Sequence, residues 1–80
     1  MKVWFIRTGL STAYTAKIDG KPYLVVADNP LHLKAFAARY LGSLDWSESQ
    51  TTLAEAKRKA ESKQVGIAFA EPDGTGWSLS

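Results

Sequence analysis

The sequence predicts a single α+β domain over residues 1–80, with a mainly antiparallel sheet of about five strands and two helices packed on one face. An Asp19-Gly20 pair between two strand-like segments predicts a hairpin. Two capped amphipathic segments, beginning at Pro30 and after Thr52, predict helices. The 45% apolar and 22% charged composition suits one small core. The expected order is β-β-β-α-(β)-α-β-β, in which the bracketed strand is optional.

Three strands are expected before the first helix. Residues 3–7 are β-branched and aromatic, and residues 13–18 and 23–27 flank the Asp-Gly turn. A two-residue loop places Ile18 opposite Lys21, Ala16 opposite Tyr23 and Tyr14 opposite Val25. One hairpin face, the better candidate for the core side, then collects Tyr14, Ala16, Ile18, Tyr23, Val25 and Ala27. Leu24 and Val26 point to the other face, so both faces of this strand are candidates for burial.

The first helix is expected from Pro30, with Asn29 as its N-cap. Its apolar positions recur at helical spacing and predict a core stripe of Leu33, Phe36, Ala37, Tyr40 and Leu41. Gly42 is suited to end it.

A second helix is expected at residues 53–63, because Thr52 and Glu55 form a capping box. Its apolar face consists of small residues and one leucine, which suits close packing on a sheet: Leu53, Ala56 and Ala60. Residues 43–50 fit a short edge strand or a loop nearly equally. Residues 65–69 and 77–79 predict two strands joined by a turn at residues 72–74.

Catalytic chemistry has few candidate residues. The chain has no cysteine, which excludes disulfides and thiolate sites, and its one histidine is His32. Asp28 and Ser11 are the neighbours that a catalytic histidine would need, but a surface histidine at a helix end explains His32 better. We therefore predict no enzyme activity, no metal and no cofactor. Without cysteines or a long apolar run, we expect a cytoplasmic protein with no membrane contact.

Charge is unevenly distributed along the chain. Residues 1–42 hold six Lys/Arg and two Asp, whereas residues 43–80 hold four Lys/Arg and six Asp/Glu. The four basic residues of the second half all lie on the second predicted helix: Lys57, Arg58, Lys59 and Lys63. A solvated helix face with a Glu55–Lys59 ion pair explains them, and so does a basic patch for phosphates or an acidic protein groove. Lys34 and Arg39 would enlarge the patch if both helices shared one side of the sheet.

These features favour a non-enzymatic module whose partner is a protein. The alternative is a small DNA- or RNA-binding domain that uses the N-terminal sheet and the basic helix, with Tyr14 and Tyr23 beside Lys21 as stacking rings. The polar loop at residues 8–12 is a further candidate for recognition. A sheet edge at residues 3–7 or 76–80 offers a route to self-association that nothing in the sequence requires.

Residues 51–77 read TTLAEAKRKAESKQVGIAFAEPDGTGW. This capped Ala/Lys-rich helix followed by a Trp-bearing hairpin resembles the C-terminal half of some small phage-encoded anti-CRISPR proteins of the type I-F group. The resemblance covers about a third of the chain, and the helix expected at residues 30–41 departs from the simplest such proteins. It implies a non-enzymatic inhibitor of a nucleic-acid-handling complex, with Lys57, Lys59 and Lys63 placed where DNA would otherwise bind.

Overall fold

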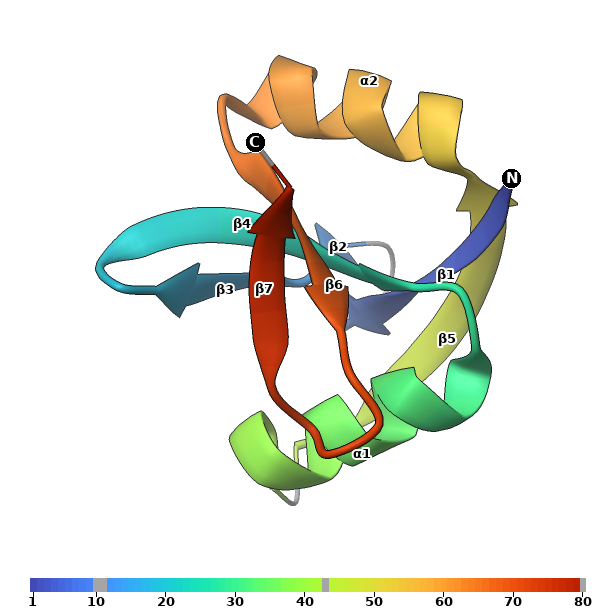
Figure 1. Ribbon diagram of the computed structural model, residues 1–80, viewed down its shortest axis with the longest axis vertical. Helices are drawn as coiled ribbons and strands as arrows, with labels where there is room; N and C mark the ends of the chain where they lie inside the picture. The colour runs from blue at the N-terminus through green and yellow to red at the C-terminus, as the bar shows by residue number, and fades with distance from the viewer. Residues whose placement is uncertain (10–11, 43, 80) are drawn as a thin grey trace.

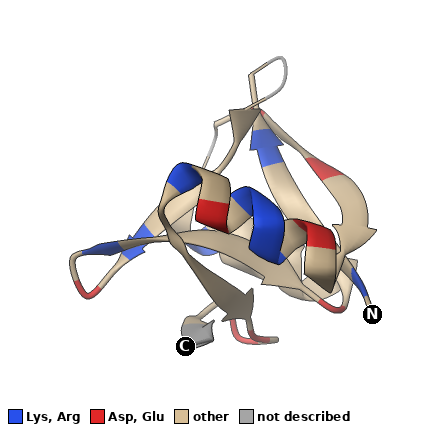
Figure 2. Ribbon diagram, turned by 90° about the horizontal axis from the view of Figure 1, so that it is seen from above, with Lys and Arg blue, Asp and Glu red and all other residues tan. Residues whose placement is uncertain are grey.

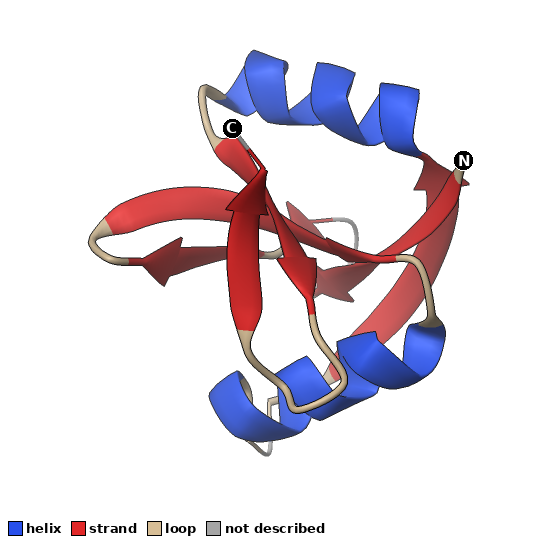
Figure 3. Cartoon of the chain, viewed as in Figure 1, coloured by secondary structure: helices blue, strands red, loops and turns tan. Residues whose placement is uncertain are grey.

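The computed structural model describes residues 1–9, 12–42 and 44–79, and the side chains of residues 77–79 lie outside that description. Strands and helices follow the predicted order, and the α+β class is confirmed (Figures 1 and 3). The elements are β1 (Lys2–Thr8), β2 (Thr12–Ala13), β3 (Thr15–Ile18), β4 (Lys21–Ala27), α1 (Pro30–Tyr40), β5 (Trp46–Thr52), α2 (Leu53–Lys63), β6 (Gly66–Ala70) and β7 (Gly76–Leu79). The optional strand is therefore present as β5, and the second predicted strand is divided into β2 and β3.

Both helices begin at the predicted caps. The Asn29 side chain accepts a hydrogen bond from the backbone N–H of Leu31 at 2.9 Å, and Pro30 opens α1. The Thr52 hydroxyl accepts one from the backbone N–H of Glu55 at 3.2 Å. These bonds satisfy N–H groups that have no partner within the helix, so local sequence alone sets where each helix starts.

The hairpin turn also forms as predicted. Asp19 and Gly20 have φ of 53° and 80°, and Ile18 pairs with Lys21 and Ala16 with Tyr23. The predicted pairing of Tyr14 with Val25 is wrong, because β3 begins at Thr15. The chain turns away from β4 at Tyr14, whose backbone N–H donates to the carbonyl of Ile6 at 2.8 Å.

Strand β1 lies inside the sheet. It pairs with β5 from Lys2 to Thr8 on one side. On the other side it pairs first with β4, at Phe5↔Val26, and then with β2, at Arg7↔Ala13. Strands β1 and β4 thus diverge, and the β2–β3 segment fills the fork between them. The expectation of an edge at residues 3–7 is therefore wrong, since β5 covers that edge.

The sheet is mainly antiparallel, as predicted. Its exception is the parallel pairing of β4 with β6, where Leu24 lies beside Ile67. Strand β7 pairs with β6 alone and is an edge of the sheet within the described part of the chain, as β5 is on the opposite side.

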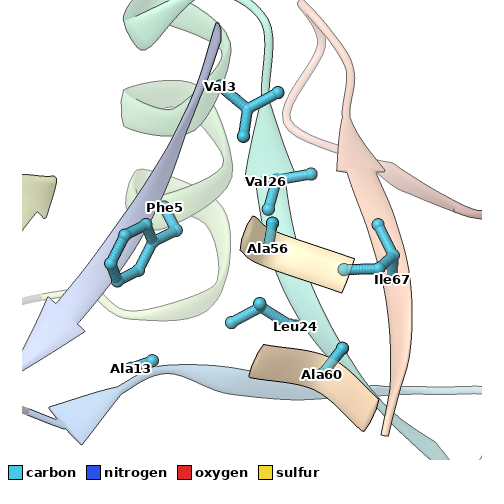
Figure 4. Packing of buried hydrophobic residues seen from close by; sticks show 8 residues of the cluster. All are labelled: Val3, Phe5, Ala13, Leu24, Val26, Ala56, Ala60 and Ile67. Atoms are coloured by element: carbon cyan, nitrogen blue, oxygen red, sulfur yellow. The ribbon is translucent and has the colours of Figure 1, made fainter. Parts of the chain in front are cut away.

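Two separate apolar clusters form the core, one under each helix. The α2 cluster consists of Val3, Phe5, Ala13, Leu24, Val26, Ala56, Ala60 and Ile67 (Figure 4). The α1 cluster consists of Ile6, Ala16, Val25, Ala27, Leu33, Phe36, Ala37 and Ala70. Consecutive residues of β4 alternate between the two clusters, so α1 and α2 lie on opposite faces of the sheet (Figure 1).

The prediction that both helices pack on one face is therefore wrong. Four consecutive residues of β4, Leu24 to Ala27, are fully buried. A strand that is apolar on both faces needs cover on both, as in parallel α/β sheets. The sequence indicates this two-sided burial at Leu24 and Val26. One helix on each face provides the apolar cover that β4 needs.

The turn between β6 and β7 packs against the backbone of α1. Gly74 has φ of 85°, and a Cβ atom added there would lie 2.9 Å from the carbonyl oxygen of Ala35. The Asp73 carboxylate accepts hydrogen bonds from the Thr75 hydroxyl at 2.6 Å and from its backbone N–H at 3.0 Å. These bonds, the hydroxyl first, hold the pKa of Asp73 below its ordinary value. The turn therefore packs the end of the β6–β7 hairpin against α1.

Truncation on either face of β4 should destabilise the fold to a similar degree. Leu24→Ala and Leu33→Ala each remove a fully buried side chain, from the α2 and α1 clusters respectively, and should each lower the free energy of unfolding by about 2–5 kcal/mol. Leu31→Ala, on the same helix as Leu33 but 66% exposed, should change it by less than about 0.5 kcal/mol. Urea denaturation measures all three, and a small effect of Leu24→Ala would contradict the two-sided core.

Gly74→Ala should destabilise the protein more than Gly20→Ala does. Both glycines have similar positive φ, which should cost an alanine about 1–2 kcal/mol at either position. A Cβ at Gly20 meets nothing within 4 Å, whereas one at Gly74 presses on α1. Equal midpoints of thermal unfolding for the two variants would show that the turn does not pack closely on the helix.

Candidate functional site

Three of the four basic residues of α2 are exposed. Ala56 and Ala60 pack on the sheet, Arg58 lies on the opposite side of the helix with Lys57 on its flank, and Lys63 is the last helical residue, so all three cations are exposed to solvent. Arg58 forms an ion pair with Glu55 at 3.1 Å, and its side chain is still 72% exposed. The view onto α2 shows basic and acidic segments alternating along the helix (Figure 2). The outer face of α2 is therefore charged and of mixed sign.

Lys59 differs from its three neighbours. Glu55 pairs with Arg58 and not with Lys59, which makes the predicted Glu55–Lys59 ion pair wrong. The ammonium of Lys59 instead lies 5.3 Å from the centre of the Phe5 ring, and Lys59 is half-buried. A cation at this distance from an aromatic ring is attracted by the ring's quadrupole. Lys59 thus contacts a side chain of β1, whereas no such contact is found for Lys57, Arg58 and Lys63 among the described residues.

A second cation contacts the same ring. Arg7 follows Phe5 by two residues on β1, so it lies on the same face of the sheet, and its guanidinium carbon is 5.6 Å from the ring centre. Arg7 is absent from the residues that sequence reasoning selects. The two-residue spacing indicates that Arg7 and Phe5 share a face of the strand. The proximity of Arg7 to Lys59 depends on how α2 crosses the sheet, which the spacing does not reveal.

Three adjoining depressions connect α2 with the end of β1. The first lies on α2 and is lined by Glu55, Arg58, Lys59, Ser62 and Lys63. The second, the Phe5 depression, is lined by Phe5, Arg7, Ser49, Gln50, Thr51, Glu55 and Lys59 and has a volume of about 360 Å³. The third is lined by Arg7, Gly9, Asp45, Trp46 and Ser47. Glu55 and Lys59 join the first two, and Arg7 joins the last two.

We call Arg7, Lys57, Arg58, Lys59 and Lys63 the basic surface. Lys34 and Arg39 do not belong to it, because they lie on α1 across the sheet. The guanidinium of Arg39 lies 5.8 Å from the ring centre of Tyr40 on its own helix. The predicted enlargement of the patch by these two residues is therefore wrong.

Aromatic rings near the N-terminus belong largely to the core. Phe5 is 3% exposed, and Trp4 and Tyr14 pack against the α1 cluster. Tyr23 is half-buried and lies close to Gly66, where an added Cβ would meet its ring at 2.6 Å. A stacking platform requires rings on an open sheet face, whereas helices cover both faces of β1 and β4.

His32 and Asp28 meet at the start of α1, with Nδ1 and Oδ1 3.6 Å apart. Ser11 and the centre of the predicted recognition loop lie outside the described residues, and the flanking Thr8 and Thr12 pair with each other. The Asp28–His32 contact links the residue before the N-cap to the first turn of the helix. The absence of enzyme activity stays a prediction.

Among the described residues, no three His, Asp or Glu side chains gather closely enough to hold a metal ion. Neither helix in this part of the chain is long and apolar enough to cross a bilayer.

Comparisons with known proteins give no relative: no family model, no curated protein and no solved structure matches the chain.

The exposed cations of α2 should be dispensable for folding. Replacing Lys57, Arg58 and Lys63 together by Gln should change the free energy of unfolding by less than about 1 kcal/mol, because exposed ion pairs contribute little and Gln is a good helix former. Urea denaturation of the triple variant against the parent protein tests this. A loss as large as that of a core truncation would show that these side chains serve the fold.

Proposed function

We propose that this chain is a non-enzymatic protein-binding module whose basic surface docks on an acidic patch of a protein partner. One observation carries the proposal. Lys57, Arg58 and Lys63 are exposed on a helix that is held to the sheet by Ala56 and Ala60, so these cations are available for binding. They adjoin the half-buried Lys59 and Arg7, which the Phe5 ring holds in place.

Mixed charge favours a protein over a nucleic acid. Glu55 and Asp45 line the same depressions as Lys59 and Arg7, and Glu61 stands on α2 between Arg58 and Lys63. Carboxylates at these places repel a continuous phosphate backbone, whereas a protein can match them with its own basic groups. The alternative function is a DNA- or RNA-binding domain. In that case the phosphates would have to bind the cations without approaching these carboxylates.

The resemblance of residues 51–77 implies an inhibitor of a nucleic-acid-handling complex. Such an inhibitor would be one kind of protein-binding module. That resemblance stays a prediction. A cytoplasmic site of action is part of the proposal, since a small domain without cysteines suits a reducing compartment.

Removing the exposed cations of α2 should weaken binding of the protein partner. The immobilised chain should retain a stoichiometric protein from a bacterial lysate. With the purified partner, the triple change of Lys57, Arg58 and Lys63 to Gln should raise the dissociation constant at least about tenfold, since each rim charge steers and holds the acidic patch. Calorimetric titration measures the constant.

A matched control is available outside the basic surface, on the β3–β4 hairpin and on α1. Lys17, Lys21 and Lys34 are also exposed, so changing them together to Gln alters net charge equally and should leave the dissociation constant within about threefold of the parent. Equal weakening by both triple variants would contradict a localised site. Recovery of no stoichiometric protein, together with steeply salt-dependent binding of DNA or RNA, would favour the alternative function.

A further inference from the structure

Two cations are held around one buried ring at the end of β1. The guanidinium carbon of Arg7 and the ammonium of Lys59 lie 5.6 and 5.3 Å from the centre of the Phe5 ring. Phe5 itself is 3% exposed and belongs to the α2 cluster. The core fixes the ring, and attraction to the ring restricts where both charges lie, so ordering them on binding should cost less entropy than ordering two side chains with no such contact.

Neither cation is neutralised within the described part of the chain. The ion pairs there join Arg58 to Glu55 and His32 to Asp28, and neither includes Arg7 or Lys59. The Nε atom of Arg7 is buried and has no hydrogen-bond partner among the described residues. A guanidinium that is partly withdrawn from water without a counterion is destabilised, and an anion placed against it would remove that penalty.

Hydroxyl groups stand beside the two cations. Pairing of β1 with β5 places Ser49 opposite Phe5 and Ser47 opposite Arg7, so both serines lie on the face that α2 occupies. Ser49 lines the Phe5 depression, and Ser47 lines the next one along Arg7. A planar guanidinium, an ammonium and neighbouring hydroxyls are donors that suit an oxygen anion.

The acidic residues at the rim disfavour an anion that extends beyond the two cations. Glu55 lines the Phe5 depression and is drawn to Arg58 at 3.1 Å, while Asp45 lines the depression on the other side of Arg7. An oxygen anion bound at Arg7 would therefore have a carboxylate on either side of it. A chain of phosphates would meet one of these carboxylates on either side, whereas an isolated Asp or Glu side chain would not.

We propose that the Phe5 depression binds a single carboxylate of an Asp or Glu side chain on the protein partner, with Arg7 as its fixed donor and Lys59 as the second cation. This inference rests on the proposed function and specifies which chemistry the partner presents. Lys57, Arg58 and Lys63 then steer the approach, and Arg7 with Lys59 forms the central contact.

Titration with a blocked hexaglutamate peptide at low salt tests the site directly. The Nε–Hε resonance of Arg7 should shift and saturate as peptide is added. Arg7→Gln should raise the dissociation constant about tenfold or more, because it removes a charge-assisted hydrogen bond. Lys63→Gln removes an exposed cation of the same surface and should change it by less than about threefold. Heptathymidylate, which carries the same charge, should bind more weakly than the peptide.

Three results would overturn the site. An Arg7 resonance that does not move, equal effects of Arg7→Gln and Lys63→Gln, or equally tight binding of heptathymidylate each contradict it. If Arg7→Gln does not fold, Lys59→Gln replaces it with the same expectation. With the captured partner, a loss of binding in the triple Gln variant but none in Arg7→Gln would refute the Phe5 depression alone and leave the proposed function standing.

Discussion

Burial of β4 on both faces is the constraint from which the rest of this structure follows. Leu24 and Val26 face α2, while Val25 and Ala27 face α1, and all four are fully buried. The described part of the chain has two helices, and each covers one face. Each cluster therefore holds its own helix, and neither helix is free to leave its face without exposing half of the core.

This arrangement places the cations of the two helices on two different surfaces. Lys34 and Arg39 go with α1, and the four cations of α2 go with the other face. Near the end of β1, the side chains of Phe5 and Arg7 lie on the face that α2 covers. The pairing of β1 with β5 places Ser49 and Ser47 beside them. The basic surface is thus assembled from α2 and β1, with its polar border supplied by β5.

Local signals predict most of the elements but not their assembly. Caps at Asn29 and Thr52 and the Asp19-Gly20 turn act within a few residues, so the sequence is sufficient to place them. The placement of α2 on the opposite face from α1, and the parallel pairing of β4 with β6, depend on contacts between distant segments. The unbroken apolar run at residues 24–27 indicates two buried faces, but it does not show which helix covers which face.

The same distinction applies to the candidate site. Arg58 could be selected from sequence because helical spacing places it opposite Ala56 and Ala60, and Lys57 and Lys63 because they lie on the flank and at the C-terminal end of the same helix. Arg7 could not, since its role arises only where Lys59 meets it over the Phe5 ring. A strand-end arginine is common in sequences, and only the crossing of α2 over β1 gives this one a second cation beside it.

Hydrogen exchange of the chain in complex with its captured partner tests the central claim most directly, since that claim places the partner on the face that carries α2. Binding on this face should add protection of backbone N–H groups in α2 and at the exposed edge of β5, with α1 and the β3–β4 hairpin unchanged. Protection confined to α1 or to the hairpin, with α2 exchanging as in the free protein, would contradict it.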